Sequence, residues 1–258
     1  MSSPYEFIIE GMRWSYSRVN SFSQCPYGWF LKYLGGAEDE ELFYASFGSF
    51  MHHLLERFYK GEATPDELEA EFFQDFDEKV IGERPKNIDF YIEQGSKFIR
   101  ELTPLPYCVV DVEKFVRFEV GGKKFVGVID LLVQDGDGEY VIIDHKSHKL
   151  QPYTGRKKPT KSDDELSQYL RQLYLYSAGV EQIYGKRPVK LCFNCFMNGN
   201  FIEVPFDDAV YETVTQEMVE EVRYIEKTDD FYPRDDWFYC RNLCGLHNSC
   251  VYYKLWRK

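Results

Sequence analysis

Apolar positions recur at helical spacing in several stretches of the chain. Between Phe47 and Tyr59 they fall at positions 47, 50, 51, 54, 55, 58 and 59, which predicts an amphipathic helix. Similar patterns predict helices in four later stretches, residues 66–79, 88–102, 164–184 and 208–227. The first of these four opens with Pro65 and Asp66, which are typical of a helix start.

Between the helices the pattern changes to short apolar runs that predict strands. Residues 107–147 contain three of them, YCVVDVEKFVRFEV, KKFVGVIDLLVQ and EYVIIDHKS, separated by the hairpin turns Gly121-Gly122 and Asp135-Gly-Asp-Gly138. Two more short strands are expected in residues 189–206. The order of helix, three-stranded meander, helix and strands predicts a mixed α/β domain with helices packed on a central sheet.

Composition excludes several classes of protein. With 44% hydrophobic and 29% charged residues, the 258-residue chain is expected to fold around a core. No apolar run approaches the roughly 18 residues of a membrane-spanning helix, and the start, MSSPYEFIIEGMRW, lacks a basic-then-apolar leader. The seven cysteines are an odd number, which favours metal or free-thiol chemistry over disulfides. A cytoplasmic protein without a membrane partner is therefore expected.

The charge of the chain is unevenly distributed. The net charge is −12, yet residues 146–161 carry six Lys or Arg and no acid, so the rest of the chain sums to −18. Such a segment can neutralise phosphates locally, and a solvated surface loop is the alternative interpretation. The basic side chains beyond the strand are Lys149, Arg156, Lys157, Lys158 and Lys161.

The second predicted hairpin brings two acids together. If its turn centres on Asp137, Asp130 lies opposite Asp144, with Cβ atoms about 5 Å apart. Lys146 projects from the same face, and hard oxygen ligands of this kind suit Mg²⁺ or Mn²⁺. A one-residue slip would separate the acids, and strand-end aspartates that accept nearby N–H groups are the alternative.

Several segments resemble one known family. Gly127-Val-Ile-Asp130 and Ile143-Asp144-His145-Lys146 resemble the metal-binding core of the PD-(D/E)XK nuclease superfamily. Three further segments resemble its RecB-type branch in sequence order: the Gly48–Glu56 helix with His52, the Gln172–Tyr176 segment, and Ser21–Pro26 together with three C-terminal cysteines.

The resemblance implies a fold and a division of the chain. It implies a single nuclease domain over residues 1–258 with a restriction-endonuclease-like core, a central mixed sheet flanked by helices. Its expected parts are an N-terminal cysteine segment and His helix, a helical insert, the catalytic core, and a C-terminal helix with the cysteine cluster, at residues 17–60, 61–106, 107–206 and 207–258.

The resemblance also implies roles for individual residues. The metal ligands would be His52, Asp130, Asp144 and the backbone carbonyl of His145. Lys146 would join Asp130 and Asp144 as a catalytic residue.

Other residues would act around that centre. Gln172 and Tyr176 would lie near DNA at the edge of the site, although a Gln/Tyr pair on a helix can also simply line a sheet. Glu56, one helical turn after His52, could orient that histidine. Glu113 could approach the metal or be an ordinary exposed strand residue.

Four cysteines form a second candidate site. By the resemblance, Cys25, Cys240, Cys244 and Cys250 would hold a [4Fe-4S] iron–sulfur cluster, although the Cys-x3-Cys-x5-Cys spacing departs from the family's shorter first gap. Structural Zn²⁺, with His247 as a candidate ligand, and free buried thiols are the alternatives. The other cysteines, at positions 108, 192 and 195, are interpreted as packing residues.

The function that the resemblance implies is a Mg²⁺- or Mn²⁺-dependent DNA nuclease. Its expected task is exonucleolytic trimming of DNA ends in recombination or repair, in a bacterial or phage-infected cell, and a recombination or CRISPR partner protein is compatible with that task. A non-catalytic DNA-binding scaffold of the same fold is the alternative from another class. A sequence-specific endonuclease that reads DNA through the helical insert is a third hypothesis.

Overall fold

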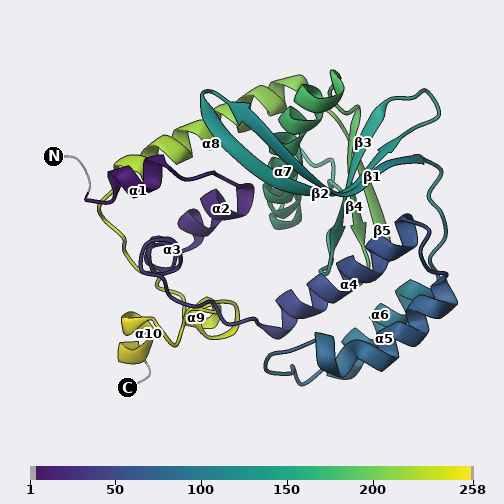
Figure 1. Cartoon of the computed structure of the whole chain (residues 1–258), viewed down its shortest axis with the longest axis horizontal. Helices are drawn as coiled ribbons and strands as arrows, with labels where there is room; N and C mark the ends of the chain where they lie inside the picture. Colours follow the sequence, from purple (N-terminus) through teal and green to yellow (C-terminus); the bar gives the residue numbers. More distant parts are fainter. Residues whose placement is uncertain (1–3, 257–258) are drawn as a thin grey trace.

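The computed structural model describes residues 4–256, in which helices surround one central sheet (Figure 1). The N-terminal helices, the helix pair after α4 and the C-terminal helices lie around the sheet in separate groups. The helices are α1 Glu6–Glu10, α2 Tyr16–Gln24, α3 Pro26–Tyr33, α4 Phe43–Tyr59, α5 Pro65–Lys79, α6 Ile88–Arg100, α7 Lys161–Tyr184, α8 Asp208–Lys227, α9 Trp237–Asn242 and α10 Val251–Trp256. No helix in this part of the chain is long and apolar enough to cross a membrane.

The sheet has five strands in sequence order, β1-β2-β3-β4-β5. Its strands are β1 Cys108–Val120, β2 Lys123–Gln134, β3 Tyr140–Lys146, β4 Lys190–Cys195 and β5 Asn200–Pro205. Strands β1 to β3 form an antiparallel meander, β4 runs parallel to β3, and β5 is antiparallel to β4. A parallel pair needs a crossover connection, and α7 provides it. The predicted mixed α/β fold is confirmed.

The register of the central hairpin is the one that the turn at Asp137 predicts. Leu131 pairs with Ile143, and the pairing continues without a shift to Gln134 and Tyr140. The next positions along this register are Asp130 and Asp144. The hairpin therefore delivers both acids to the same end of the sheet.

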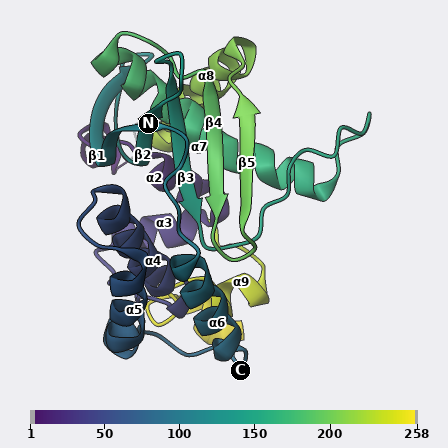
Figure 2. The same ribbon diagram turned by 90° about the vertical axis from the view of Figure 1, so that its right-hand side faces the viewer.

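Both faces of the sheet are buried. Leu132, Ile142 and Leu191 face the main core, which α7 and α8 also line. Leu131 and Ile143 face the opposite side, towards the end of α4. Figure 2 shows α7 crossing behind the strands, with the loop that precedes it projecting to one side.

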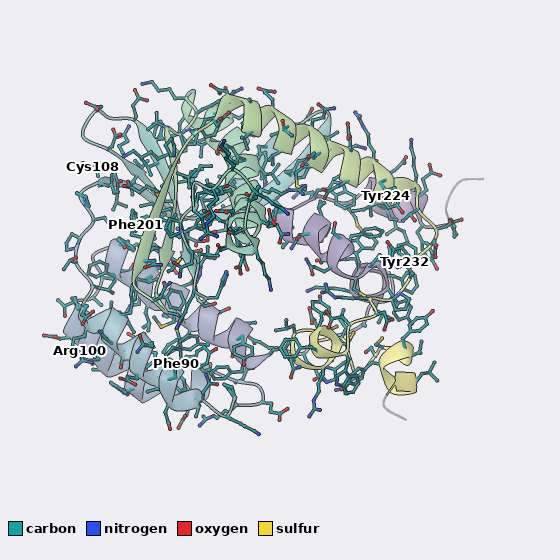
Figure 3. All side chains as sticks on the ribbon, turned by 180° about the vertical axis from the view of Figure 1, so that it is seen from behind. Phe90, Arg100, Cys108, Phe201, Tyr224 and Tyr232 are labelled. Carbon is teal, nitrogen blue, oxygen red and sulfur yellow. The ribbon has the colours of Figure 1, made fainter. Side chains whose placement is uncertain are left out.

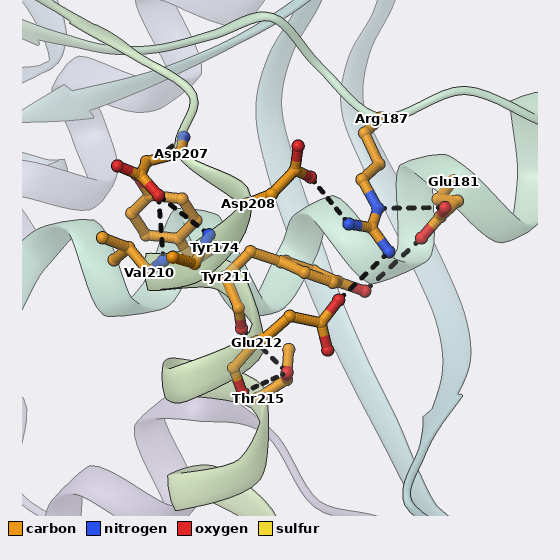
Figure 4. A network of polar contacts seen from close by, with 10 residues as sticks. Tyr174, Glu181, Arg187, Asp207, Asp208, Val210, Tyr211, Glu212 and Thr215 are labelled. Atoms are coloured by element: carbon orange, nitrogen blue, oxygen red, sulfur yellow. Dashed lines mark hydrogen bonds and ion pairs between the residues drawn. The ribbon is translucent and has the colours of Figure 1, made fainter.

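Arg187 fastens the end of α7 to the start of α8 (Figure 4). Its guanidinium contacts Glu181 at 3.0 Å, Asp208 at 2.8 Å and Glu212 at 3.4 Å. It also lies 4.2 Å from the centre of the Tyr211 ring. One arginine thus links the crossover helix to the helix that follows the last strand.

A second apolar cluster joins α4 to α5 and α6, the helices within the expected insert. Phe47, Phe72 and Ile99 are fully buried there. Phe90 and Arg100 mark this region in Figure 3, far from Tyr224 and Tyr232 at the other end of the molecule. Because α4 packs on both the insert and the sheet edge, the insert fixes the helix that carries His52.

Sequence patterns missed several helix boundaries. The helices α1 to α3 are five to nine residues long, too short to show a clear apolar period. Helix α7 starts three residues before the predicted position, because Thr160 and Asp163 form a capping box.

Candidate metal centre

The carboxylates that the hairpin was expected to pair lie in different surroundings. Asp130 accepts the backbone N–H of His145 at 2.8 Å and has an 11% exposed side chain. Asp144, 5% exposed, lies 2.7 Å from the ammonium of Lys146. The structure therefore brings the predicted acid–acid–lysine group together at the end of β2 and β3.

His52 reaches this group from α4. Its Nε2 lies 3.1 Å from the carbonyl oxygen of His145, and its Nδ1 lies 3.5 Å from Asp130. The histidine and the carbonyl oxygen are two of the predicted metal ligands. His53, the next residue, points away and lies 3.7 Å from Glu71 in the insert.

Glu113 also belongs to this group, which the sequence left open. Its carboxylate lies 3.7 Å from Nδ1 of His52. Glu56, the expected orienting residue, instead forms an ion pair with Lys60 at 2.5 Å. The carboxylate next to the histidine therefore comes from β1 and not from α4.

Burial and mutual charge shift the pKa values of the group. Burial, followed by the negative charge of Asp144, raises the pKa of Asp130 to about 7. Burial opposes the charged form of His52, but Glu113 and the two aspartates outweigh it and raise the pKa of the histidine. Burial likewise opposes charge on Lys146, and its contact with Asp144 raises the pKa overall. A site whose acids resist losing their protons is short of positive charge.

The residues present fit a hard divalent cation. Ligand atoms of His52, Glu113 and Asp130 all lie within 4.8 Å of one another. Among residues 4–256 no other trio of His, Cys, Asp or Glu side chains meets that limit. Two carboxylates and an imidazole are ligands that Mg²⁺ and Mn²⁺ accept. A cavity of about 500 Å³ opens beside this trio, lined by residues that include Gly48, His53 and Ser147.

Lys146 is held by aromatic rings as well as by Asp144. Its ammonium lies 5.2 Å from the centre of the Tyr169 ring and 5.9 Å from that of Phe193. Tyr169 packs in turn on His148, with ring centres 4.6 Å apart. These contacts direct the lysine along the sheet end, and no sequence pattern pointed to Tyr169.

Gln172 and Tyr176 lie on α7 below the acids. Tyr176 is 7% exposed, and its ring rests directly on the backbone of Gly127. Gln172 hydrogen-bonds to the Tyr176 side chain, which senses the charges of Asp144 and Asp130. The tyrosine thus lies under the metal centre, and its contact with DNA stays a prediction.

The basic segment forms an exposed loop between β3 and α7. Lys149 lies 5.1 Å from the centre of the Phe90 ring in the insert. Residues 154–160, called here the basic loop, contain Arg156, Lys157 and Lys158, all exposed. Lys161, which follows the loop at the start of α7, is exposed as well.

Asp163 ties both ends of the basic loop together. Its carboxylate accepts backbone N–H and hydroxyl hydrogen bonds from Thr154 and Thr160, four in all, at 2.6 to 2.8 Å. These bonds lower the pKa of the Asp163 carboxyl. The loop therefore presents its positive charges from a fixed base.

The four predicted cysteines line one small cavity. Cys25, Cys240, Cys244 and Cys250 all border it. Burial and the neighbouring cysteines raise the pKa of Cys244 to about 11, so a cation is needed to hold its thiolate. The structure thus joins α3 to the C-terminal segment through this cavity.

Backbone groups already face two of these sulfur atoms. Cys25 accepts N–H groups from Gly28 at 3.3 Å and Arg234 at 3.4 Å, and Cys250 accepts that of Tyr253 at 3.4 Å. His247, the alternative zinc ligand, lies 3.5 Å from Glu40.

Comparison with known proteins identifies relatives of this chain. The family model of the PD-(D/E)XK nuclease superfamily matches residues 13–251. One of the two subunits of an ATP-dependent helicase/deoxyribonuclease from Clostridium botulinum is 34% identical over 90 residues, 32% of this chain. A protein of Desulforamulus reducens that is named as part of an ATP-dependent helicase/nuclease is 31% identical over 128 residues, 48% of this chain. The matched segments make up only 8% and 10% of those two relatives.

A solved structure has the same fold. A protein from Eubacterium rectale, described as "Putative exonuclease", superposes with a TM-score of 0.55 and 13% sequence identity. The match covers 99% of this chain and 92% of that one.

Proposed function

The chain belongs to the PD-(D/E)XK nuclease superfamily, and from that premise we propose that it is a metal-dependent deoxyribonuclease that trims DNA ends. The observation that carries the proposal is the group formed by His52, Asp130, Asp144 and Lys146 at one end of the sheet. A scaffold protein has no physical need to bury two acids next to each other. Such burial is costly unless a cation or a partner compensates for it.

The metal would be held by His52, Asp130, Asp144 and the carbonyl oxygen of His145. A bound divalent ion polarises the phosphate and lowers the pKa of a coordinated water. Lys146, positioned by Asp144 and by the Tyr169 ring, donates hydrogen bonds to the attacking water and to charge that develops on the phosphate oxygens. Asp130 is kept in place by the N–H of His145.

The substrate is positioned through its phosphates. The basic loop, Lys149 and Lys161 supply positive charge next to the sheet end that carries the acids, and Gln172 and Tyr176 support that end from α7. Phosphate contacts orient DNA without reading its sequence, so cleavage with little sequence preference is expected. The relatives that match are named as components of helicase/nucleases, which supports a partner protein in recombination or repair.

Cleavage of end-labelled linear DNA tests the proposal. Metal-stripped protein should be inactive, and Mg²⁺ or Mn²⁺ should restore loss of the label. Lys146→Ala should reduce the rate by about 10²–10³-fold while DNA binding is retained. Lys190→Ala is the matched control, because this strand lysine also faces a carboxylate, Glu203 at 3.5 Å, but lies at the other end of the sheet.

The different results separate the hypotheses. Full activity of Lys146→Ala would refute the mechanism. DNA binding without cleavage under any metal would favour the scaffold function. Linearisation of closed circular DNA would indicate an endonuclease, since an exonuclease needs an end.

The cysteine cavity is proposed to hold a [4Fe-4S] cluster with a structural role. Support comes from the four sulfur-bearing residues around one cavity and from N–H groups that face Cys25 and Cys250. In the described residues no three of these sulfurs lie within 4.8 Å of one another, whereas around one zinc ion they would be about 3.8 Å apart.

Metal analysis of anaerobically purified protein tests the cluster. Iron and acid-labile sulfide with a brown colour are expected, and both should be lost in Cys25→Ser. Cys108→Ser should keep them, because Cys108 is exposed on β1. Stoichiometric zinc in a colourless protein would replace the cluster with a zinc site.

A further inference from the structure

Glu113 has an unusual backbone in the middle of a strand. It is the only described residue other than glycine with a positive φ, at 50°. Its neighbours Val112 and Lys114 pair normally with β2, and a register shift between Val109 and Asp111 lies just before it. A glutamate in the left-handed region is strained, and such strain persists where the surroundings enforce it, often at functional sites.

This backbone sends the Glu113 side chain to His52. The carboxylate lies 3.7 Å from Nδ1, an ion-pair distance that a small side-chain rotation closes to a hydrogen bond. Glu113 is 27% exposed, so it has room for that rotation.

No other neighbouring carboxylate in the described part of the chain is free for this task. Asp130, 3.5 Å from the same nitrogen, already accepts the N–H of His145 and is a proposed metal ligand. Glu56, on the same helix as His52, pairs with Lys60. Glu113 is therefore the carboxylate left to accept a proton from Nδ1.

The position of the ring proton decides whether His52 can bind a metal. Its Nε2 lies 3.1 Å from the carbonyl oxygen of His145, the other ligand proposed on that side. Nε2 offers a lone pair to a cation only when the ring proton is on Nδ1. Ligating histidines typically donate their second N–H to a carboxylate, which fixes both tautomer and orientation.

Building on the proposed function, we propose that Glu113 is a positioning residue of the metal centre. Its carboxylate accepts the Nδ1 proton of His52 and turns Nε2 towards the metal. The left-handed backbone at position 113 is the distortion that brings the carboxylate there. The chain therefore keeps local strain in β1 in exchange for metal affinity.

Two substitutions separate this role from a structural one. Glu113→Gly and Glu113→Asn both suit a positive φ, and neither side chain reaches His52. Mn²⁺ binding to metal-stripped protein, measured by calorimetry, should weaken about 10–100-fold in each. The melting temperature of the metal-free protein should stay the same or rise, because the strain is relieved. A fall in melting temperature with unchanged Mn²⁺ affinity would overturn the proposal and make Glu113 a structural residue.

Glu113→Gln distinguishes positioning from direct coordination. Its amide oxygen still accepts the Nδ1 proton, so Mn²⁺ affinity should remain within about threefold of the unsubstituted protein if Glu113 positions His52. A loss as large as in Glu113→Gly would mean that the negative charge itself binds the metal, which overturns the positioning role. Glu56→Gln is the matched control and should bind Mn²⁺ normally.

His52→Ala separates this proposal from the proposed function. If the unsubstituted protein binds no Mn²⁺, the proposed function fails and the role of Glu113 fails with it. If it binds Mn²⁺ and His52→Ala does not, while both Glu113→Gly and Glu113→Asn bind normally, only the role of Glu113 is refuted.

Discussion

Replacing Gly127 with alanine should disturb the contact between β2 and α7. A Cβ atom at this position would lie 2.5 Å from Cε1 and 2.7 Å from Cζ of Tyr176. Carbon atoms at optimal separation are about 3.5–4.0 Å apart, so the ring has to move by about 1 Å. Tyr176 is buried and packs on Phe118, with ring centres 6.5 Å apart, so this movement meets resistance.

The expected cost is that of an overpacked core, about 1–3 kcal/mol. For a chain of this size each kcal/mol lowers the melting temperature by about 2–4 °C, so a fall of roughly 2–12 °C is expected. Urea denaturation of the metal-free protein gives the free energy directly. Gly136→Ala is the control, because its Cβ would meet no atom within 4 Å and its φ is not positive.

A second substitution tests the cause. Tyr176→Leu removes the ring that the new methyl group meets, so it should cost less in the Gly127→Ala background than alone. The two substitutions should show a favourable coupling of about 1–3 kcal/mol. Strictly additive effects, or a Gly127→Ala variant as stable as Gly136→Ala, would refute the close contact between glycine and ring.

Three further changes test the basic loop and its surroundings. Asp163→Ala should expose the basic loop to rapid trypsin cleavage and weaken DNA binding, whereas Asp164→Ala, an exposed neighbour, should do neither. Replacing the three basic residues of the loop with glutamine should reduce the slope of log affinity against log salt by up to about 2.7 on duplex DNA, and an unchanged slope would exclude phosphate contacts. Burial and the charge of Lys146 lower the pKa of His148 to about 4, while the unfolded chain binds that proton below about pH 6.5. The free energy of unfolding should therefore rise between about pH 4 and 6.5, by up to about 1.4 kcal/mol per pH unit, and His148→Gln should flatten this rise in urea titrations.

The sheet and the predicted acids follow from local sequence rules. A turn centred on Asp137 fixes the pairing of every residue in the hairpin, because a strand alternates strictly between its two faces. That rule places Asp130, Asp144 and Lys146 at one end without any knowledge of the rest of the chain. Periodicity alone does not carry His52 to them; its position in the family pattern does.

The contacts around the metal centre could not be predicted in the same way. Regular alternation describes a strand with ordinary backbone angles, and Glu113 has a positive φ next to a register shift. Helical spacing made Glu56 a neighbour of His52, but Lys60 on the same helix attracts that carboxylate. Tyr176 was placed on the correct helix, yet its depth depends on the missing side chain of Gly127.

The cysteine cavity sets an order of events during synthesis of the protein. Cys25 and Cys240 are 215 positions apart, so at about 5–20 residues per second the last three cysteines follow the first by roughly 10–40 s. Residues 52–146, which supply the metal ligands, have all been made in that interval. The catalytic hairpin can therefore form while α3 still lacks its C-terminal partner, and closure of the two ends becomes a late maturation step that waits for both the finished chain and the supply of inorganic cofactor.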